Sequence, residues 1–440
     1  MDEVALDEIA RGALADHGGP GCSVAIVTRR GTRFGAYGLA RTEPATVFRP
    51  DTLLPIASMG KPFTATAVMT LVEAGRVHLD APVRTYLRDF GVVDETAGET
   101  VTVRNLLTHA VGWAGDVPWV EDRGDAALAL QVANIATARQ ILPPGWLFSY
   151  SNTAMTVAAR LVEVLYGEPF ETVVERLILR PLGLDATGYF PERVISAPAA
   201  SGHRDGKPVQ EAWLGPRSAG GAGAQYSNAV DLARWMGWWL GYGPVGPIGE
   251  ETRTRMITEL IPVGLGPAST GLGWHVDHRG GGDVVYHEGA LPGIGAINLF
   301  VPQAEVGLVV LVNTENAGRI YRRIVDRLLD DLAGVRKPAK RLHADLAPDT
   351  LAELSGSYAI EQPATVYERI VVESEVSRLV IRSEPGGFHP PALPIAREHD
   401  DLFAVDAGPW RDMPVEFVRS PGGEVFGVRI AGRVFPRLVD

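Results

Sequence analysis

The sequence predicts an α+β domain followed by a small antiparallel β-barrel. Two observations predict the first domain: strand-like segments lie near both ends of the first 335 residues, and helical segments fill the interval between them. A third observation predicts the barrel. Beyond residue 345 the chain changes to short runs that alternate apolar and polar residues, separated by turns such as Pro421-Gly422-Gly423.

The elements of the first domain follow from hydrophobic periodicity and from turn residues. The first helix ends at Gly18, and a turn at 29–31 joins two strands into a hairpin. Strands and a helix close the domain, so its two ends are expected to share one sheet. In order, we predict helix 6–17, strands 22–28 and 32–39, helices 61–74, 103–107, 153–166, 170–178 and 228–240, strands 284–287, 296–301 and 306–313, and helix 317–332.

A polar, basic connector separates the two parts of the chain. We therefore predict a first domain over residues 1–335, a linker over 336–345 and a barrel domain over 346–440. The barrel strands are predicted at 354–360, 367–373, 379–383, 402–405, 415–419, 425–430 and 433–438.

Composition limits the possible functions. The 440 residues include 53 Asp and Glu against 41 Lys and Arg, a formal net charge of −12, which argues against nucleic acid or anionic lipid as the main partner. One cysteine, Cys22, excludes an intrachain disulfide and a multi-cysteine metal site. No apolar run reaches the ~18 residues that a membrane helix needs. Residues 1–16 lack the regions of a signal peptide, so we expect a cytoplasmic protein.

Lysine is unusually rare. Only four of the 41 basic residues are lysine, and one of them, Lys61, lies inside an apolar run. Arginine stays protonated in proteins, whereas a buried lysine can give up its proton. A lysine kept at such a position indicates a task that arginine cannot perform.

The segment Ser58-Met59-Gly60-Lys61 begins the predicted helix 61–74. A spacing of three residues puts both side chains on one helix face, and the positive field of the helix N-terminus favours an oxyanion and lowers the pKa of an amine. A buried, neutral Lys61 is then able to take the proton of Ser58. The alternative is a helix-capping serine followed by a surface lysine.

Two further segments carry groups suited to acyl transfer. In Tyr150-Ser151-Asn152 either a polar residue caps the next helix, or the phenol shuttles a proton and the amide holds the lysine or a substrate carbonyl. His287-Glu288-Gly289 ends a predicted strand. It is either an edge histidine at a turn, or a strand bordering an active site with a backbone N–H as oxyanion donor.

Together the three segments resemble the serine penicillin-binding-protein and class C β-lactamase superfamily, which includes D-peptidases, family VIII esterases and acyltransferases. The resemblance covers about residues 20 to 335 and implies a β-lactamase/transpeptidase-like fold: an antiparallel sheet flanked by helices, with a helical subdomain. Supporting segments lie at 102–109, 150–153, 180–184, 219–221 and 271–274.

The resemblance implies a role for each motif residue. Ser58 is the implied nucleophile and Lys61 the general base, while Tyr150 shares the base role and protonates the leaving group. Asn152 is implied to orient Lys61 and a substrate amide. His287 falls where many members carry lysine, which puts efficient β-lactam hydrolysis in doubt.

The implied oxyanion hole is formed by the backbone N–H groups of Ser58 and Ala290, with Gly289 beside the substrate. Trp113 and Trp146 flank the motif loops and are candidates for an aromatic substrate wall.

The C-terminal region resembles the lipocalin-like barrel of D-aminopeptidase-like enzymes and of penicillin-binding-protein-type thioesterases, which cyclise nonribosomal peptides. Within the ending Gly432 to Arg437, the resemblance makes Arg437 a candidate for binding a substrate carboxylate. The alternative is a stabilising appendage that carries arginine on its surface.

We therefore expect a serine hydrolase or acyltransferase without cofactor or metal. It would form an acyl-enzyme on Ser58 with an amide, ester or thioester of a peptide-like substrate, D-residue peptides and carrier-tethered peptides included. The alternatives are a thioesterase that releases and macrocyclises a nonribosomal peptide, a family VIII-type esterase, and a non-catalytic binding protein. The intact Ser58, Lys61 and Tyr150 disfavour the binding protein.

Overall fold

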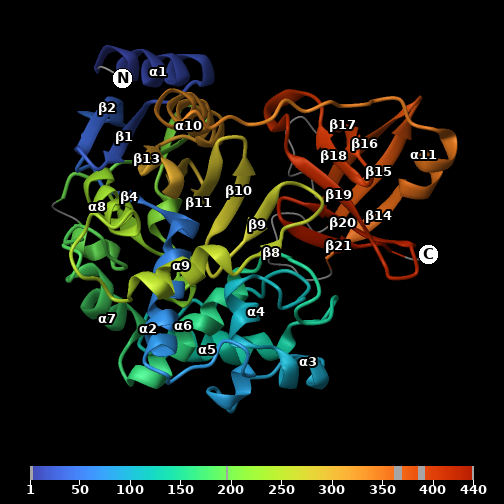
Figure 1. The fold of residues 1–440 in the computed structure, drawn as a ribbon, viewed down its shortest axis with the longest axis horizontal. Coiled ribbons are helices and arrows are strands. Elements are labelled where there is room, and N and C mark those ends of the chain that lie inside the picture. Colours follow the sequence, from blue (N-terminus) through green and yellow to red (C-terminus); the bar gives the residue numbers. More distant parts are fainter. Residues whose placement is uncertain (1–2, 195–196, 361–368, 385–391, 439–440) are drawn as a thin grey trace.

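A computed structural model describes residues 3–194, 197–360, 369–384 and 392–438. Its first part is built on a nine-stranded antiparallel sheet in the order β3-β2-β1-β13-β12-β11-β10-β9-β8 (Figure 1). Because β1 pairs with β13, the two ends of this part share one sheet, as predicted. The strands are β1 (Gly21–Thr28), β2 (Gly31–Thr42), β3 (Ala45–Val47), β8 (Ile261–Pro262), β9 (Ala268–Thr270), β10 (His275–Arg279), β11 (Gly282–Leu291), β12 (Ile294–Val301) and β13 (Val306–Val312).

Helices lie on both sides of this sheet and in a separate group below it (Figure 1). They are α1 (Glu3–His17), α2 (Lys61–Glu73), α3 (Glu95–Thr100), α4 (Val103–Leu107), α5 (Ala127–Asn134), α6 (Asn152–Tyr166), α7 (Phe170–Val174), α8 (Ala229–Trp239), α9 (Glu250–Thr258) and α10 (Ala317–Ala333). None of the helices in the described ranges has the length and apolar character needed to cross a membrane. The cytoplasmic location stays a prediction.

The alternation of side chains along β1 explains why helices cover both faces of the sheet. Val24 and Ile26 pack with α1 and α10 on one face, while Ala25 and Val27 belong to the core that includes α8 on the other. Side chains of a strand alternate between the two faces of a sheet, so an unbroken apolar run indicates burial on both. Helix α2 is also enclosed, because every side chain from Lys61 to Met69 is buried.

Two short two-stranded sheets flank this core. Strands β4 (Leu54–Pro55) and β7 (Tyr226–Ser227) form one, and β5 (Gly202–Arg204) and β6 (Lys207–Val209) form the other. The first sheet ties the segment just before Ser58 to the segment just before α8.

The C-terminal part is a nearly closed antiparallel barrel of eight strands among the described residues, at the right of Figure 1. A bridge between Tyr358 and Arg437 joins the first strand to the segment after the last. Helix α11 (Pro348–Leu354) precedes the strands, which are β14 (Gly356–Ala359), β15 (Arg369–Glu375), β16 (Arg378–Glu384), β17 (Leu393–His399), β18 (Leu402–Val405), β19 (Pro414–Arg419), β20 (Val425–Ile430) and β21 (Arg433–Pro436).

Strand β17 was not predicted. It contains Pro394, and proline weakens a strand assignment because it has no N–H to donate to the ladder. The predicted start of the second barrel strand, residues 367–368, lies outside the described residues. The domain boundaries at 335 and 346 stay predictions; α10 ends at Ala333 and α11 begins at Pro348.

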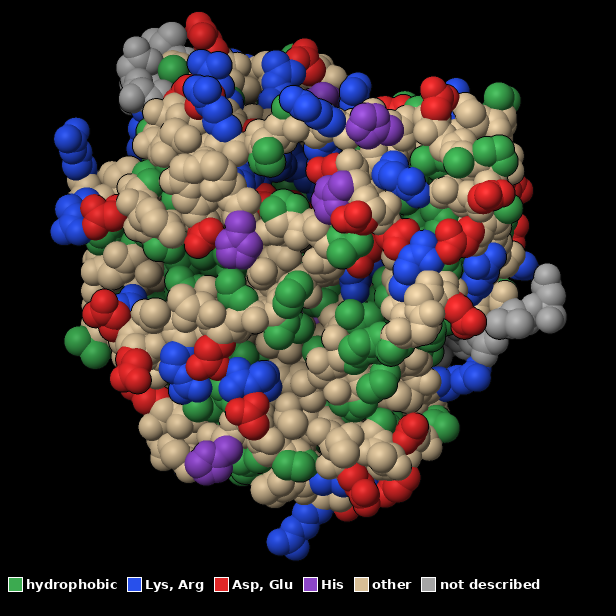
Figure 2. All heavy atoms as spheres, turned by 45° about the vertical axis from the view of Figure 1, so that its right-hand side comes forward, with side chains coloured by type: hydrophobic (Ala, Val, Ile, Leu, Met, Phe, Trp, Pro, Cys, Tyr) green, Lys and Arg blue, Asp and Glu red, His purple; other side chains and the backbone are tan. Residues whose placement is uncertain are grey.

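Charged side chains of both signs are intermingled on the face that carries the barrel (Figure 2). Ion pairs such as Arg369 with Glu384 and Arg382 with Glu373 lie on the barrel. Such exposed pairs each contribute little to stability.

Candidate active site

Ser58 lies in a short 3-10 turn, Ala57–Gly60, that leads directly into α2. The preceding residue, Ala57, has a φ of 49°, a left-handed conformation that is uncommon for a residue with a side chain. A Cβ at Gly223 would lie 2.5 Å from the carbonyl oxygen of Ala57, so only glycine lets this neighbouring loop approach. The turn that presents Ser58 is therefore held in a strained shape by close backbone packing.

Lys61 lies directly behind Ser58. Its Nζ is 2.8 Å from Ser58 Oγ and donates a hydrogen bond of 2.6 Å to the carbonyl oxygen of Ala222. The side chain is fully enclosed, and this burial lowers its pKa well below that of a free lysine. A neutral amine that donates one N–H to Ala222 keeps a lone pair for the proton of Ser58.

Tyr150 lies against the same amine, with its ring centre 4.9 Å from Lys61 Nζ. Burial raises the pKa of its phenol, although a side-chain hydrogen bond with Ser58 acts in the opposite direction. The two shifts separate the groups: the amine loses its proton readily and the phenol keeps its own. Lys61 is therefore the better base, and Tyr150 the better proton donor.

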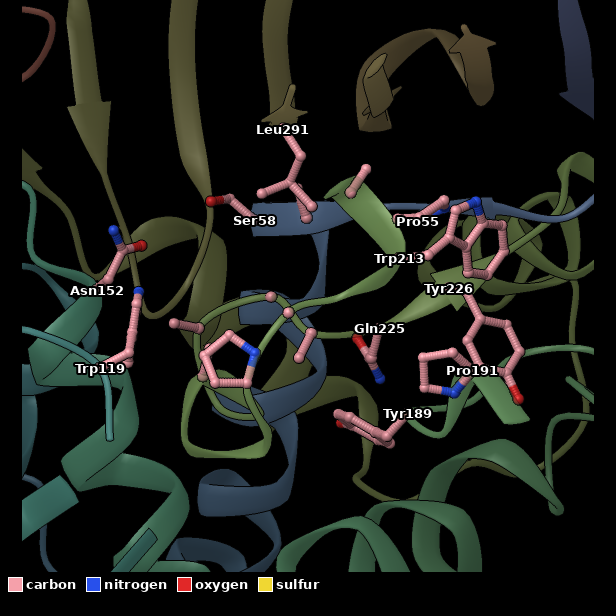
Figure 3. A pocket seen from close by; sticks show the side chains of 18 of the residues that line it. Pro55, Ser58, Trp119, Asn152, Tyr189, Pro191, Trp213, Gln225, Tyr226 and Leu291 are labelled. Atoms are coloured by element: carbon pink, nitrogen blue, oxygen red, sulfur yellow. The ribbon is translucent and has the colours of Figure 1, made fainter. Parts of the chain in front are cut away.

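Asn152 is the first residue of α6, and Asp116 holds it. The Asp116 carboxylate accepts hydrogen bonds from Asn152 Nδ2 at 2.9 Å and from the backbone N–H groups of Asn152 at 2.6 Å and Thr153 at 3.0 Å. The Asn152 Nδ2 group thus bonds to Asp116, whereas the resemblance implied that this amide orients Lys61. In Figure 3 the amide oxygen of Asn152 lies on the side that faces Ser58.

The barrel completes this site with the turn between β20 and β21. Arg433 Nη2 donates to Asp116 Oδ2 at 2.8 Å, and the guanidinium lies over the Tyr150 ring, 5.2 Å from its centre. The backbone N–H of Tyr150 donates to the Gly432 carbonyl at 2.8 Å. One arginine of the second domain therefore contacts both a motif residue and the carboxylate that holds Asn152.

The charge of Arg433 matters because Asp116 is buried. Burial alone raises the pKa of this carboxyl, but Arg433 and the hydrogen bonds from Thr153 and Asn152 hold the pKa below its usual range. A carboxyl whose pKa is lower in the folded chain than in the unfolded chain stabilises the fold above its unfolded pKa. That stability is lost as the pH falls through the folded value.

We expect Arg433→Ala to lower the free energy of unfolding by about 3–5 kcal/mol near neutral pH, because Asp116 is left as a buried, uncompensated charge. Without Arg433, burial raises the pKa of Asp116, which then takes up a proton on mild acidification. The deficit relative to the unmodified protein is therefore largest near neutral pH and shrinks toward about pH 4. Urea denaturation across this pH range measures it.

Arg437→Ala is the matched control. The Arg437 side chain donates to the backbone carbonyls of Glu353 and Ser355 in the barrel and not to Asp116. Loss of the Arg437 side chain should lower the free energy of unfolding by less, and by an amount that does not change with pH between neutral and pH 4. Equal, pH-independent deficits in both variants would contradict the role assigned to Arg433.

His287 lies on β11 inside a group of buried rings. Its ring centre is 5.0 Å from that of His275, which is 6.3 Å from His109 and 6.2 Å from Tyr150. The Nδ1 of His287 lies 2.8 Å from the carbonyl oxygen of Glu288, while its Nε2 is buried without a partner. Burial, with His275 and Lys61 nearby, lowers the pKa of His287 far below its ordinary value, and burial lowers that of His275 to about 4.

The role implied for His287 at the substrate stays a prediction. Its side chain is 2% exposed and is not among the residues that line the pocket at Ser58. The imidazoles do not form a metal site either. Among the described residues, no three His, Cys, Asp or Glu side chains are grouped so as to hold a metal ion.

We expect His287→Lys to lower the free energy of unfolding by at least about 2 kcal/mol near neutral pH, because it puts an amine beside Lys61 in a buried place. The unfolded chain protonates this lysine and the folded chain resists doing so, hence the deficit grows as the pH falls. His278→Lys on β10 is the control, since His278 is half exposed beside Asp283. Normal stability of His287→Lys would mean that position 287 opens toward solvent or substrate.

The remaining predicted site residues fall into two groups. Ala290 lines a pocket together with Ser58 and Asn152, as an oxyanion donor requires. Gly289 is buried, and a Cβ there would lie 2.1 Å from the Ile56 carbonyl oxygen, so its small size lets β11 pack against the segment before Ser58.

Trp113, Trp146 and Arg437 do not line this pocket, and their contacts with a substrate stay predictions. Trp113 is 2% exposed in the helical core, 6.1 Å from the ring centre of Phe90. Trp146 packs against Phe426 of the barrel. None of the three lines the pocket at Ser58.

Comparison with known proteins decides the family. A family model described as Beta-lactamase matches residues 6–331, more than half of the chain. The chain belongs to the β-lactamase family. Penicillin-binding protein 4 of Amycolatopsis lactamdurans is 30% identical over 361 residues, which cover 79% of this chain and 94% of that protein. This β-lactamase-family chain is therefore related along most of its length to serine hydrolases and penicillin-binding proteins.

Two other relatives carry names that refer to peptides. The D-alanyl-D-alanine-carboxypeptidase/endopeptidase AmpH of Escherichia coli K12 is 26% identical over 74% of this chain and 89% of its own. The unguisins hydrolase ungD' of Aspergillus campestris is 28% identical over 74% of this chain, and the match spans 65% of that protein.

Among solved structures, SurE with D-Leu superposes with a TM-score of 0.77 at 24% identity and covers 99% of both chains. A penicillin-binding protein homologue of Pyrococcus abyssi gives a TM-score of 0.68 at 23% identity, covering 96% of this chain and 97% of its own. These two likenesses extend through the barrel and show the shared fold.

Proposed function

We propose that this β-lactamase-family protein is a serine hydrolase or acyltransferase that forms an acyl-enzyme on Ser58 with a peptide-like amide, ester or thioester. The observation that carries the proposal is the 2.8 Å separation of Lys61 Nζ and Ser58 Oγ, with the lysine fully buried and the serine open to the pocket. General-base activation of a serine needs this pairing of a nucleophile with an amine that is neutral at the working pH.

In the first step, Ser58 Oγ attacks the carbonyl carbon and its proton passes to Lys61. The negative charge on the carbonyl oxygen is stabilised by the backbone N–H groups of Ser58 and Ala290. The bond to the leaving group then breaks, and Tyr150 gives that group a proton. Lys61 returns its proton to Tyr150, so the amine and the phenol are both restored.

In the second step, water or an amine attacks the acyl-enzyme and Lys61 accepts the proton of this nucleophile. The bond between Ser58 Oγ and the carbonyl carbon breaks, and Lys61 passes its proton to Ser58, so both groups are restored. Hydrolysis and aminolysis differ only in the second nucleophile. For that reason, the same groups serve a hydrolase, and equally a thioesterase that closes a peptide on its own amine.

Three observations support a peptide-like substrate. Relatives are named as a D-alanyl-D-alanine carboxypeptidase/endopeptidase and as unguisins hydrolases, and the fold match that covers both domains is to SurE crystallised with D-Leu. The Asn152 amide, held by Asp116 at the edge of the pocket, is suited to a substrate amide group. An esterase of the family VIII type remains an alternative, favoured by the 35% identity to Esterase EstB of Burkholderia gladioli over 205 residues.

A matched set of acyl donors tests the proposal. One peptide with a free N-terminal amine is prepared as its N-acetylcysteamine thioester, its ethyl ester and its primary amide, with a D or an L residue at the reacting end. Release of the leaving group establishes acyl transfer, and mass spectrometry of the product separates the linear acid from the cyclic peptide. The proposed function would be excluded if none of these donors is turned over and a fluorophosphonate does not label the protein.

A further inference from the structure

A two-residue turn joins β20 to β21 and places Arg433 at the first position of β21. Hydrogen bonds tie this turn to the segment before α6 on both sides of Arg433. On one side the Gly432 carbonyl accepts from the backbone N–H of Tyr150 at 2.8 Å. On the other side the N–H of Val434 donates to Ser149 Oγ at 3.2 Å. The barrel therefore holds Arg433 at a fixed place beside the proposed catalytic segment.

The Asp116 carboxylate that Arg433 contacts is 3% exposed and surrounded by donors. Most of these donors belong to the start of α6: the hydroxyl of Ser151, the N–H and side-chain amide of Asn152, and the N–H of Thr153. All of the donors at the start of α6 are neutral. Of the groups that donate to Asp116, only the guanidinium of Arg433 carries a charge.

Several elements bring titratable groups to the buried amine of Lys61. They are Tyr150 before α6, Asp116 before α5, Arg433 on β21, His109 after α4, His275 on β10 and His287 on β11. Burial lowers the pKa of each of the three imidazoles and raises that of the phenol, so all four rings are neutral near neutral pH. The Glu288 carboxylate of β11 is paired with Arg322 of α10 at 3.4 Å.

The charges of Asp116 and Arg433 have opposite effects on Lys61. Burial is the main cause of the low pKa of this amine; beside it, Asp116 raises the pKa and Arg433 lowers it. The amine and the guanidinium are also neighbours of one ring, since Lys61 Nζ lies 4.9 Å and the Arg433 guanidinium 5.2 Å from the centre of Tyr150. Charges act strongly over such distances where water is excluded.

Asp116 thus has a benefit and a cost for a site that needs a neutral lysine. Its hydrogen bonds fix Asn152 and the start of α6. Its negative charge, left alone in the interior, would hold a proton on Lys61, and a protonated amine is no base. Pairing with an arginine, which stays charged at any working pH, keeps the hydrogen bonds and cancels the charge.

We propose that Arg433 is a positioning residue of the reaction: the barrel supplies a fixed cation that lets Asp116 hold Asn152 without holding a proton on Lys61. The inference rests on the proposed function, because it takes Lys61 to be the base. The barrel then belongs to the acid–base machinery of the first domain.

The pH dependence of acylation by an activated ester tests this role, because the acid limb of kcat/KM reports the protonation of the base in the free protein. Arg433→Met removes the charge, leaves Asp116 unopposed and should move the acid limb to higher pH by about one unit or more. Asp116→Asn leaves Arg433 unopposed and should move the limb to lower pH. The double variant lacks both charges, and its limb should return close to the original pH.

Arg429→Met is the matched control for loss of an arginine from a buried pair. Arg429 donates to Glu416 at 2.7 Å, and the same carboxylate accepts from the N–H of Leu265 in the first part of the chain. This variant should be less stable than the unmodified protein, with its acid limb in place. Arg433→Lys keeps the charge and should also keep the limb; with Asp116→Asn it carries the test if Arg433→Met does not fold.

Three results would overturn the inference. The first is one and the same acid limb in the unmodified protein, Arg433→Met and Asp116→Asn. The second is a shift of the same sign in the two single variants, since loss of structure alone has no reason to reverse its sign with the charge removed. The third is a shift in Arg429→Met equal to that in Arg433→Met.

A titration without substrate separates this inference from the proposed function. The chain has only four lysines, so ¹³C-labelled lysine gives few Cε signals, and Lys61→Arg identifies the signal of Lys61 by its loss. The midpoint of that signal should shift with the same signs in Arg433→Met and Asp116→Asn. If it does and no ester is turned over, the effect of Arg433 on Lys61 stands and the acyl-transfer proposal alone fails. An equal midpoint in all three proteins overturns the inference whatever the activity.

Discussion

Ser58→Ala should lose covalent labelling by a fluorophosphonate and lower kcat by at least about 10⁴-fold, the order of loss expected when an acyl-transfer nucleophile is removed. Substrate binding should persist, because the pocket walls and the Asn152 amide do not depend on the hydroxyl. The measurements are probe labelling, steady-state kinetics with an activated ester, and equilibrium binding to the variant.

The fold of Ser58→Ala should be intact, because Ser58 is half-buried and its side chain bonds to Lys61 and Tyr150, which belong to the site itself. An unchanged melting temperature is therefore the internal control. Labelling that survives in this variant would place the nucleophile at another residue.

Lys61→Arg is expected to lower the acylation rate by at least about 10²-fold, at the lower end of what general-base catalysis contributes. Arginine keeps the positive charge and much of the length, but a guanidinium does not give up its proton at working pH. The rate in the unmodified protein should follow the deprotonated form of one group whose pKa is well below that of free lysine. Activity is thus lost as the pH falls, when Lys61 takes up a proton.

Lys207→Arg provides the comparison, since Lys207 is an exposed residue of the β5–β6 hairpin and the change there is only a change of cation. It should leave both the acylation rate and its pH profile as they are. A near-normal rate in Lys61→Arg would show that a fixed cation at position 61 is sufficient, and the base would have to be sought at Tyr150.

The order of elements in the first domain could be predicted from the sequence because its segments carry strong local signals. Helix α10, for example, repeats Ile320, Ile324 and Leu328 at a spacing of four, and α6 ends at a glycine in the left-handed conformation, Gly167. The weakly patterned elements were missed. Strands β8 and β9 are short, and β10 is polar, so none of them carries a clear strand pattern. They join the sheet one after another beyond β11, which pairs with β10 as far as Gly282.

The pairing of Ser58 with Lys61 also follows from local geometry, because three residues at the start of a helix fix their separation. The partners that come from distant segments of the chain could not be predicted from local geometry. Asp116 and Ala222 carry no sequence signal, since each acts through contacts that only the folded chain creates. Arg433 and Arg437 lie four residues apart in one turn and strand, and the barrel's position against Tyr150 decides which of them reaches the site.

His287 illustrates the limit of reasoning from motif position. The segment does border Ser58, since Ala290 lines the same pocket. The alternation of side chains along β11 puts His287 on the same face as Gly289, which packs against Ile56 and Ala57, and the His287 ring lies 5.0 Å from that of His275. The position of the segment beside Ser58 could thus be predicted from the motif, and a contact between His287 and a substrate stays a prediction.

Rapid mixing with acid quench tests the central claim most directly. The protein is mixed with an excess of activated ester or thioester, quenched within the first turnover, digested and analysed by mass spectrometry. The account predicts a burst of leaving group equal to the enzyme concentration, and one acyl group on the peptide that contains Ser58. Turnover in which that peptide stays unmodified, or in which the acyl group is on another residue, would contradict it.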